Sequence, residues 1–475
     1  MCSIDFTGLT KQDLDHSNNQ DYAKKFDTGL SEDLVRSISE SKNEPSWMLD
    51  IRLQALQKFN ELPLPSWGPS LKKLDFKKIR YFAKASDKKN SKTWNDVDLE
   101  IKKTFDRLKI PQAEREILAG VGAQYESENI YHNVKDVWSK QGVIFEDFDT
   151  AVMKYPELVQ KYFSKCVPLT DHKFAALHYA VTSGGTFLYV PKGIEITQPL
   201  QAYFRMNAMN QGQFEHTLII VEEGAKAHYI EGCSAPRYGS KSLHAGCVEV
   251  FVEKGAQIRY SSVENWSKDT YNLNTKRAIV NDNAKMEWIG GNLGSGVTML
   301  YPSSLLVGNG ARADHLGIAL ANEGQNQDVG SKVTISGKNC RTNIVSKSLS
   351  KGGGISTYRG IVDVKKSAEN AVVHVECDAL LFDDHSTADT IPQITCENDT
   401  AQITHEASAG KISDEVLLYF ESRGIGEDEA RGMIVNGFLN EVVKTLPLEY
   451  ASELNRLIEM EMENSIGSDN PNFKC

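Results

Sequence analysis

The residues best suited to sulfur or metal chemistry in this chain form two separate groups that contain cysteine. The first is Cys233, in the segment Glu231-Gly-Cys-Ser-Ala-Pro236. The second comprises Cys377, His405 and Glu406. Thiolate, imidazole and carboxylate groups are ligands for iron, zinc or an iron–sulfur cluster, and a thiolate is also a nucleophile. Each group also has a structural interpretation, namely a buried core cysteine, with a surface His-Glu pair beside the second.

A faint internal repeat determines where these residues lie. A tight turn that ends in alanine or another small residue recurs every 27 to 31 residues, with strand-forming residues on both sides. The turns end at Ala225, Ala256, Ala284, Ala311, Cys340 and Ala368. A period of this length predicts a solenoid, whose strands stack about 4.8 Å apart around one continuous core. Cys340 occupies the alanine position, so we expect it to be a small core residue.

Counting from the turns predicts which candidates are neighbours. Cys233 and Glu264 each lie eight residues after a turn alanine, so they should be adjacent on successive rungs. Cys377 and the pair His405-Glu406 likewise fall on adjacent turns. Neighbouring residues of a strand point to opposite faces, so His405 and Glu406 can share one metal ion only at a bulge or a sheet edge. Three such ligands would leave one coordination position open.

A reactive Cys233 also needs cations nearby, because the thiolate is the nucleophilic form of cysteine. Glu264 would oppose ionisation of the thiol if it lay close. The candidate cations are Arg205, His244, Lys276 and Arg277.

The repeat lies between two helical regions, so we expect a mainly β fold in three parts. Residues 1–165 should be mostly helical with a flexible arm, residues 166–408 should form a parallel β-helix, and residues 409–475 should be helical. Ser413 is a suitable N-cap for the first of the C-terminal helices. We expect the end helices to cap the open edges of the solenoid, which would otherwise invite aggregation, although a docking role remains open.

Composition argues against several classes of function. The net charge of −11 disfavours nucleic-acid binding, and no apolar run is long enough to span a membrane. The N-terminus lacks the features of a signal peptide, so we expect a cytoplasmic protein. The eight cysteines include no CxxC pair, which excludes a zinc ribbon, and the glycine-rich segments lack the phosphate-loop pattern, so ATP hydrolysis is not expected of this chain.

Segments along nearly the whole chain resemble the SufB/SufD family of the SUF iron–sulfur cluster assembly machinery. The resemblance rests on Glu44-Pro-Ser-Trp-Met-Leu49, Gly120-Val-Gly-Ala-Gln-Tyr-Glu-Ser-Glu128, Ile230-Glu-Gly-Cys-Ser-Ala-Pro236, Glu376-Cys-Asp378, His405-Glu-Ala407 and Met433-Ile-Val-Asn-Gly437. The Cys-Ser-Ala-Pro segment favours the SufB type of scaffold subunit, because SufD-type subunits generally lack it. The resemblance implies a right-handed parallel β-helix that assembles a transient iron–sulfur cluster and is not itself an enzyme.

The resemblance also implies roles for individual residues. Cys233 would accept sulfur as a persulfide. Cluster assembly would take place at Cys377, with His405 and Glu406, near the junction with a partner. Sulfur would pass between the two sites, inside the β-helix, along a path formed by Arg205, Asn207, Glu264, Trp266 and Lys276.

The implied partners are an ABC ATPase of the SufC type, a SufD-type paralogue or a second copy of this chain, and a cysteine desulfurase with its sulfur-transfer protein. The C-terminal helical region would contact the ATPase. Flavin binding is left open. One residue departs from the family pattern: Glu264 stands where many members have glutamine, and its carboxylate would oppose a passing anion unless Lys276 pairs with it.

Three alternatives remain at this point. The chain could be a structural partner of the SufD type without a sulfur-accepting role. It could be a β-helix enzyme that acts on polysaccharide, although the candidate residues include thiols. The metal at Cys377 could also be a structural zinc ion.

Overall fold

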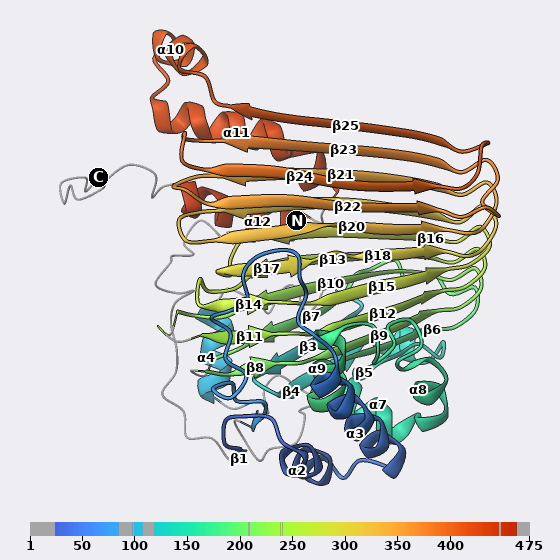
Figure 1. The fold of residues 1–475 in the computed structure, drawn as a ribbon. Coiled ribbons are helices and arrows are strands. Elements are labelled where there is room, and N and C mark those ends of the chain that lie inside the picture. The colour runs from blue at the N-terminus through green and yellow to red at the C-terminus, as the bar shows by residue number, and fades with distance from the viewer. Residues whose placement is uncertain are drawn as a thin grey trace.

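The computed structural model describes residues 24–84, 97, 99–107, 118–207, 210–237, 239, 241–445 and 448–462. The start of the predicted N-terminal arm and the tail after residue 462 lie outside these ranges. Two long β-sheets dominate the structure and face each other across a shared interior (Figure 1). Successive rungs pair in parallel, so the predicted mainly β fold with a parallel solenoid is confirmed.

The first sheet has ten strands, which form the side of the solenoid that carries both candidate cysteines. In spatial order they are β25 (Gln402–Lys411), β23 (Val372–Leu381), β21 (Arg341–Ser350), β19 (Arg312–Ala321), β16 (Lys285–Asn292), β13 (Gln257–Asn265), β10 (Lys226–Ser234), β7 (Leu200–Arg205), β3 (Gly120–Tyr125) and β4 (Glu128–Val134).

Most strands of the second sheet are shorter, and two of them pair with the same neighbour. Its order is β5 (Ile144–Asp147), β6 (Gly185–Val190), β9 (His216–Val221), β12 (Cys247–Val252), β15 (Thr275–Val280), β18 (Ser303–Leu306), β20 (Asn326–Ile335), β17 (Val297–Leu300), β14 (Thr270–Asn272), β11 (Ser242–His244) and β8 (Gly212–Gln213). Two more strands, β22 (Ile355–Val364) and β24 (Thr387–Cys396), continue it from β20.

Each unit of the repeat detected in the sequence corresponds to one rung of the solenoid, and the turn that marks the unit is one corner of that rung. The turn residues in the left-handed backbone conformation are Gly224, Gly255, Asn283, Gly310 and Asn339, with φ between 52° and 69°. Glycine and asparagine adopt this conformation at the lowest cost. The residues that follow them, Ala225, Ala256, Ala284, Ala311 and Cys340, are 0% exposed. Cys340 therefore fills the alanine position in the core, as predicted.

Helices cover the outer faces of both sheets. The second sheet is covered by α2 (Glu32–Lys42), α3 (Ser46–Glu61), α7 (Phe148–Lys154), α8 (Pro156–Tyr162) and α9 (Lys173–Val181), which share one apolar cluster with it. The first sheet is covered by α11 (Glu427–Val443) and α12 (Leu448–Met462). The remaining elements are α4 (Leu99–Arg107), α6 (Asp136–Ser139), α10 (Asp414–Ser422) and the short pair β1 (Lys24–Lys25) and β2 (Ala83–Lys84).

One expectation about the ends of the chain is wrong, and another needs an addition. The region 1–165 contains strands besides the predicted helices, because β3 pairs in parallel with β7 and β5 pairs with β6, which extends both sheets into it. The C-terminal helices α11 and α12 do not cap a sheet edge, since their apolar side chains pack on the outer face of the first sheet. The predicted cap of α10 is confirmed, because the Ser413 side chain accepts a hydrogen bond from the Val416 backbone N–H.

The end of the solenoid formed by β24 and β25 is consequently an open edge. Among the strands that the structure describes, each of these two has a neighbour on one side only. Most side chains of β24 are exposed, including Ile391 (43%) and Ile394 (41%). An unprotected edge with exposed apolar residues is unusual for an isolated protein and is typical of an association surface.

Candidate functional site

Cys233 lies on β10, inside the solenoid, beside the residue predicted to be its neighbour. In the parallel ladder it pairs with Glu264 of β13 on one side and with Phe204 of β7 on the other. The Cys233 side chain is 2% exposed and belongs to the interior apolar cluster. The next residue, Ser234, accepts a hydrogen bond from Arg205 (Nη1 to Oγ, 2.9 Å). The prediction that Cys233 and Glu264 are adjacent is therefore confirmed.

Glu264 belongs to a buried polar network centred on Lys276. The Lys276 ammonium donates to Glu264 Oε1 at 2.7 Å and to Ser262 Oγ at 3.2 Å. It also lies 3.5 Å from Glu231 Oε1. The other oxygen of Glu264 accepts a hydrogen bond from Asn272 Nδ2 at 2.7 Å. The ion pair with Lys276 that was required of a carboxylate at position 264 is thus formed.

The charges around Cys233 keep its thiol protonated. Burial raises the pKa of Cys233 well above the ordinary thiol value. The carboxylates of Glu231, Glu264 and Glu215 raise this pKa further, and Lys276 opposes them. Lys276 favours the thiolate and Glu264 opposes it, as expected, but burial and the carboxylates outweigh the cation in this conformation.

Two of the other predicted cations are paired elsewhere. His244 Nε2 pairs with the buried carboxylate of Glu215. Arg277 pairs with Asp171 at 2.7 Å on the outer side of the second sheet. Arg277 and Lys276 are neighbours on β15, so their side chains point to opposite faces and only one of them reaches the interior.

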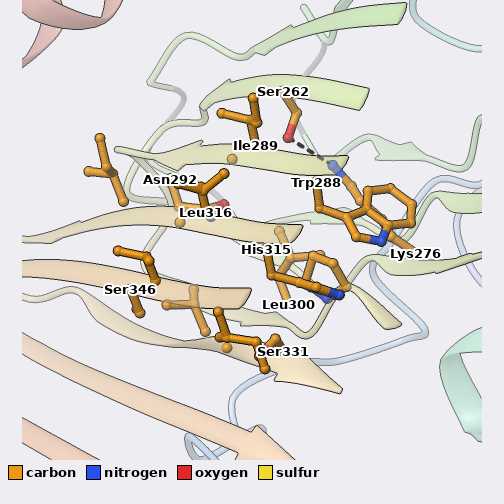
Figure 2. Close-up of a pocket in the computed structure, with 18 of the residues that line it drawn as sticks. Ser262, Lys276, Trp288, Ile289, Asn292, Leu300, His315, Leu316, Ser331 and Ser346 are labelled. Atoms are coloured by element: carbon orange, nitrogen blue, oxygen red, sulfur yellow. Dashed lines mark hydrogen bonds between the residues drawn. The ribbon is translucent and has the colours of Figure 1, made fainter. Parts of the chain in front are cut away.

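An internal cavity extends from the Lys276 network toward the other candidate site. Figure 2 shows Ser262 and Lys276 on one side of it and Ser346 and Ser331 on another. Tyr358 of β22 also lines it, and its hydroxyl is 3.2 Å from Ser331 Oγ. The cavity therefore spans rungs from β13 to β21 in the first sheet.

Its wall is partly polar, and glycine provides some of its space. His315 Nε2 lies 2.9 Å from Ser304 Oγ, which accepts a hydrogen bond from Trp288 Nε1 at 3.1 Å. A Cβ placed on Gly317 would meet no atom within 4 Å. These residues were not predicted from the sequence, although alternation along β19 places His315 and Gly317 on the same face.

A second pocket adjoins Ser234 on a different side of Cys233. Three cationic side chains, Arg205, Arg237 and Lys268, line it together with Trp266. The indole N–H of Trp266 is buried, and no residue in the described part of the chain accepts a hydrogen bond from it. Leu457 and Met460 of α12 complete the lining.

The five predicted path residues thus do not line one continuous space. Arg205 and Trp266 line the second pocket, Lys276 lines the internal cavity, and Glu264 joins the Lys276 network to Cys233. Asn207 is buried after the end of β7, lines neither of these pockets, and has its backbone N–H bonded to the Glu126 carboxylate at 3.1 Å.

Cys377 and His405 meet near the open edge of the solenoid. The Cys377 Sγ atom on β23 lies 3.9 Å from His405 Nε2 on β25. Burial raises the pKa of the Cys377 thiol to about 12, although a hydrogen bond from the Tyr358 hydroxyl favours the thiolate. The register partner of Cys377 on β21 is Ser346, which lines the internal cavity. The cavity therefore extends to the rung next to the Cys377–His405 pair.

Glu406 does not join this pair in the present conformation. The register between β23 and β25 is regular, so Glu406 lies beside Glu376 and faces away from the side to which His405 points. The outer face around Glu376 carries an ion pair with Lys347 at 2.6 Å. The structure thus brings together Cys377 and His405 but places the third predicted ligand, Glu406, on the opposite face of the edge strand.

The structure is thus a parallel β-helix with a partly polar cavity between two buried cysteines and a thiol–imidazole pair at an open edge. These features suit a class of protein that handles sulfur or metal. Family comparison agrees with this class. The model "SUF system FeS cluster assembly, SufBD core domain" matches residues 204–438, and the model "SufBD protein N-terminal region" matches residues 18–202. The chain belongs to the SufBD family of iron–sulfur cluster assembly proteins.

Individual relatives are similar over nearly their whole length. The chain is 51% identical over 443 residues to the iron–sulfur cluster assembly protein SufB of Bacillus subtilis (strain 168), covering 93% of this chain and 95% of that protein. It is 52% identical over the same coverage to an iron–sulfur cluster assembly SufBD family protein of Staphylococcus aureus (strain MRSA252). Among the helices that the structure describes, none is sufficiently long and apolar to cross a membrane.

Proposed function

We propose that this chain is the scaffold on which SUF partners build an iron–sulfur cluster, with sulfur received at Cys233 and the cluster assembled at Cys377 and His405. A donor persulfide transfers its outer sulfur to the Cys233 thiolate, and the donor leaves as a thiolate. Five rungs of about 4.8 Å each separate β10 from β23, so Cys377 cannot attack this persulfide directly. We propose that a small thiol takes the outer sulfur as its own persulfide, which releases the Cys233 thiolate, and then passes that sulfur to the Cys377 thiolate and leaves as a thiolate. None of these exchanges needs an external oxidant or reductant.

The internal cavity is the observation that supports this route most strongly. It is lined at one side by Lys276, which contacts the register partner of Cys233, and at another by Ser346, the register partner of Cys377. A persulfide is easily oxidised, so transport among mostly buried side chains protects it. Lys276, at the Cys233 end of the cavity, would stabilise the negative charge of the moving sulfur.

Thiolate formation would require a change from the conformation described here. The pKa of both thiols is raised chiefly by burial, so exposure or a bound cation is needed to deprotonate them. We propose that a SufC-type ATPase contacts the C-terminal helices, and that movement of α12 opens the pocket lined by Leu457 and Met460. ATP hydrolysis would take place in that partner.

The open edge at β24 and β25 would be completed by a SufD-type paralogue or by a second copy of this chain. Such a partner would supply ligands beyond Cys377 and His405, and a rearrangement at the edge would be needed for Glu406 to contribute. A cysteine desulfurase with its transfer protein would supply sulfur. We place this function in the cytoplasm, where reducing conditions preserve free thiols.

Anaerobic reconstitution with partners tests the cluster site. We expect Cys377→Ala and His405→Ala to lose most of the bound iron and acid-labile sulfide, and Cys396→Ala, an exposed cysteine near the same edge, to retain them. Equal iron and sulfide in all three variants would refute the assignment of the site.

A further inference from the structure

A separate cluster of metal-binding side chains lies on the outer side of the second sheet. His178 on α9, His216 at the start of β9 and Cys247 at the start of β12 place one potential ligand atom each within 4.8 Å of one another. His216 and Cys247 are direct register partners in the parallel ladder. The two imidazoles are closer still, with His178 Nε2 only 3.0 Å from His216 Nδ1. None of the three residues has a role in the proposed sulfur route.

Each histidine has an oxygen atom beside its outer nitrogen, but only His178 makes a hydrogen bond to it in this conformation, and His216 Nε2 is a buried nitrogen without a hydrogen-bond partner among the described residues. His178 Nδ1 lies 3.0 Å from the Ala245 carbonyl oxygen, which accepts only if this nitrogen carries the proton. The lone pair of His178 is then on Nε2, directed at His216. His216 Nε2 lies 3.3 Å from Glu249 Oε2. A carbonyl or carboxylate behind the ring is the usual arrangement that orients a histidine toward a metal ion.

Glu249 is itself fixed and fully buried. Its two carboxylate oxygens accept hydrogen bonds from the backbone N–H groups of Ser164, Cys166 and Val167 at 2.7, 2.7 and 2.8 Å. Three such donors are the environment of an ionised carboxylate. A buried negative charge is costly unless a positive charge compensates it, and the cluster lies directly beside it.

The surroundings of the cluster are apolar and dry. The rings of Phe148 and Phe163 lie 4.6 and 4.7 Å from the His216 ring, between centroids. His178 is 1% exposed, and His216 and Cys247 are 0% exposed. The helix α9 that carries His178 packs between α3 and the sheet, so an ion here would join the N-terminal helical layer to the solenoid.

We propose that His178, His216 and Cys247 bind one divalent transition-metal ion of the zinc type, which fastens α9 to β9 and β12. Two imidazoles and one thiolate are a donor set that suits zinc. Binding displaces the Cys247 thiol proton and the proton between the two imidazoles. Zinc–nitrogen bonds of about 2.0–2.1 Å in tetrahedral geometry separate two nitrogens by about 3.3 Å, so the histidines need to move apart by only a few tenths of an ångström.

Charge balance supports the same ion. A divalent cation, one thiolate and the Glu249 carboxylate sum to zero, with both histidines neutral. The site also combines residues from a helix and two strands, so it would form only in the folded chain. The binding free energy of the ion would therefore add to the free energy of unfolding.

Cobalt substitution of the full-length chain tests the proposal. The protein is freed of metal with a chelator, in a Cys233→Ser, Cys377→Ser background so that those thiols do not compete, and is titrated with Co²⁺ alone. We expect one ion per chain, with a thiolate-to-cobalt charge-transfer band. Cys247→Ala should abolish that band, while Cys340→Ala, which alters another fully buried cysteine, should leave it unchanged.

Two further measurements keep the test decisive if Cys247→Ala folds poorly. Glu249→Gln retains all three ligands and should weaken Co²⁺ binding roughly 10- to 100-fold. Metal analysis of the protein as purified should find zinc at about one ion per chain. Less than one tenth of an ion after zinc addition, a charge-transfer band that survives in Cys247→Ala, or unchanged affinity in Glu249→Gln would each overturn the proposal.

Discussion

Replacing Lys276 with methionine tests whether the buried ion pairs around Cys233 are arranged as described. The change keeps the length of the side chain but leaves Glu264 and Glu231 without the ammonium that lies 2.7 and 3.5 Å away. At an effective dielectric constant of about 20, those distances correspond to about 6 and about 5 kcal/mol of attraction. Desolvation of the buried ions offsets much of this, and removing one partner of a buried pair costs about 3–5 kcal/mol net.

We therefore expect Lys276→Met to lower the free energy of unfolding in urea at pH 7 by about 3–5 kcal/mol. Adding Glu264→Gln should recover part of the loss, because the amide removes one uncompensated charge and still accepts from Asn272. Lys276 also favours the Cys233 thiolate, so alkylation of Cys233 in the folded protein should become slower in Lys276→Met.

Two outcomes would contradict this reasoning. The free energy of unfolding of Lys276→Met could lie within about 1 kcal/mol of that of the unaltered chain, which would mean that the charges of the carboxylates are compensated in another way. The double variant could also be no more stable than Lys276→Met, which would mean that Glu264 is not the partner whose charge matters. Lys285→Met, which removes a partly exposed ammonium from an outer ion pair, provides the control and should cost at most about 1 kcal/mol.

Three more predictions concern single side chains. In the native protein, Cys396 should be alkylated well before Cys377, because Cys396 is exposed whereas burial raises the pKa of Cys377 to about 12. Peptide mass mapping measures the two rates, and equal rates would contradict the burial of Cys377. Burial lowers the pKa of His315 from 6.5 to about 3, so below pH 6.5 the unfolded chain binds more protons than the folded chain, and the free energy of unfolding falls as the pH drops from 6.5 toward 3. In urea unfolding measured between pH 6.5 and 4, His315→Gln should make this fall with pH shallower. An unchanged slope would be evidence against a neutral buried His315. Cys340→Ala should leave the iron and sulfide content unchanged, since the thiol only fills a turn position, and a strong loss of cluster would show that Cys340 has a chemical role.

The solenoid and its internal register could be predicted from the sequence because both follow from a local rule. Each rung needs a left-handed residue and then a small buried one, so the turns are visible as Gly or Asn before Ala. Counting from the turns then placed Cys233 beside Glu264, and Cys377 close to His405, as the structure confirms.

Features that depend on contacts outside the repeat could not be predicted in this way. The strands β3 and β5 precede the first recognisable turn, so nothing in the period marked them as solenoid strands. The position of His178 depends on how α9 docks on the sheet, which the spacing of the repeat does not describe. The opposite directions of Lys276 and Arg277, by contrast, follow from strand alternation and could have been predicted once β15 was recognised.

Sulfur transfer in variants of Gly317 tests the central claim, that sulfur moves from Cys233 to Cys377 through the internal cavity. A side chain at Gly317 has room to enter the cavity, so Gly317→Leu should obstruct it while Gly317→Ala leaves most of it free. After loading with labelled sulfur in the presence of partners, mass mapping should find the label at both cysteines in Gly317→Ala, but only at Cys233 in Gly317→Leu. Equal labelling of Cys377 in a folded Gly317→Leu protein would contradict the account.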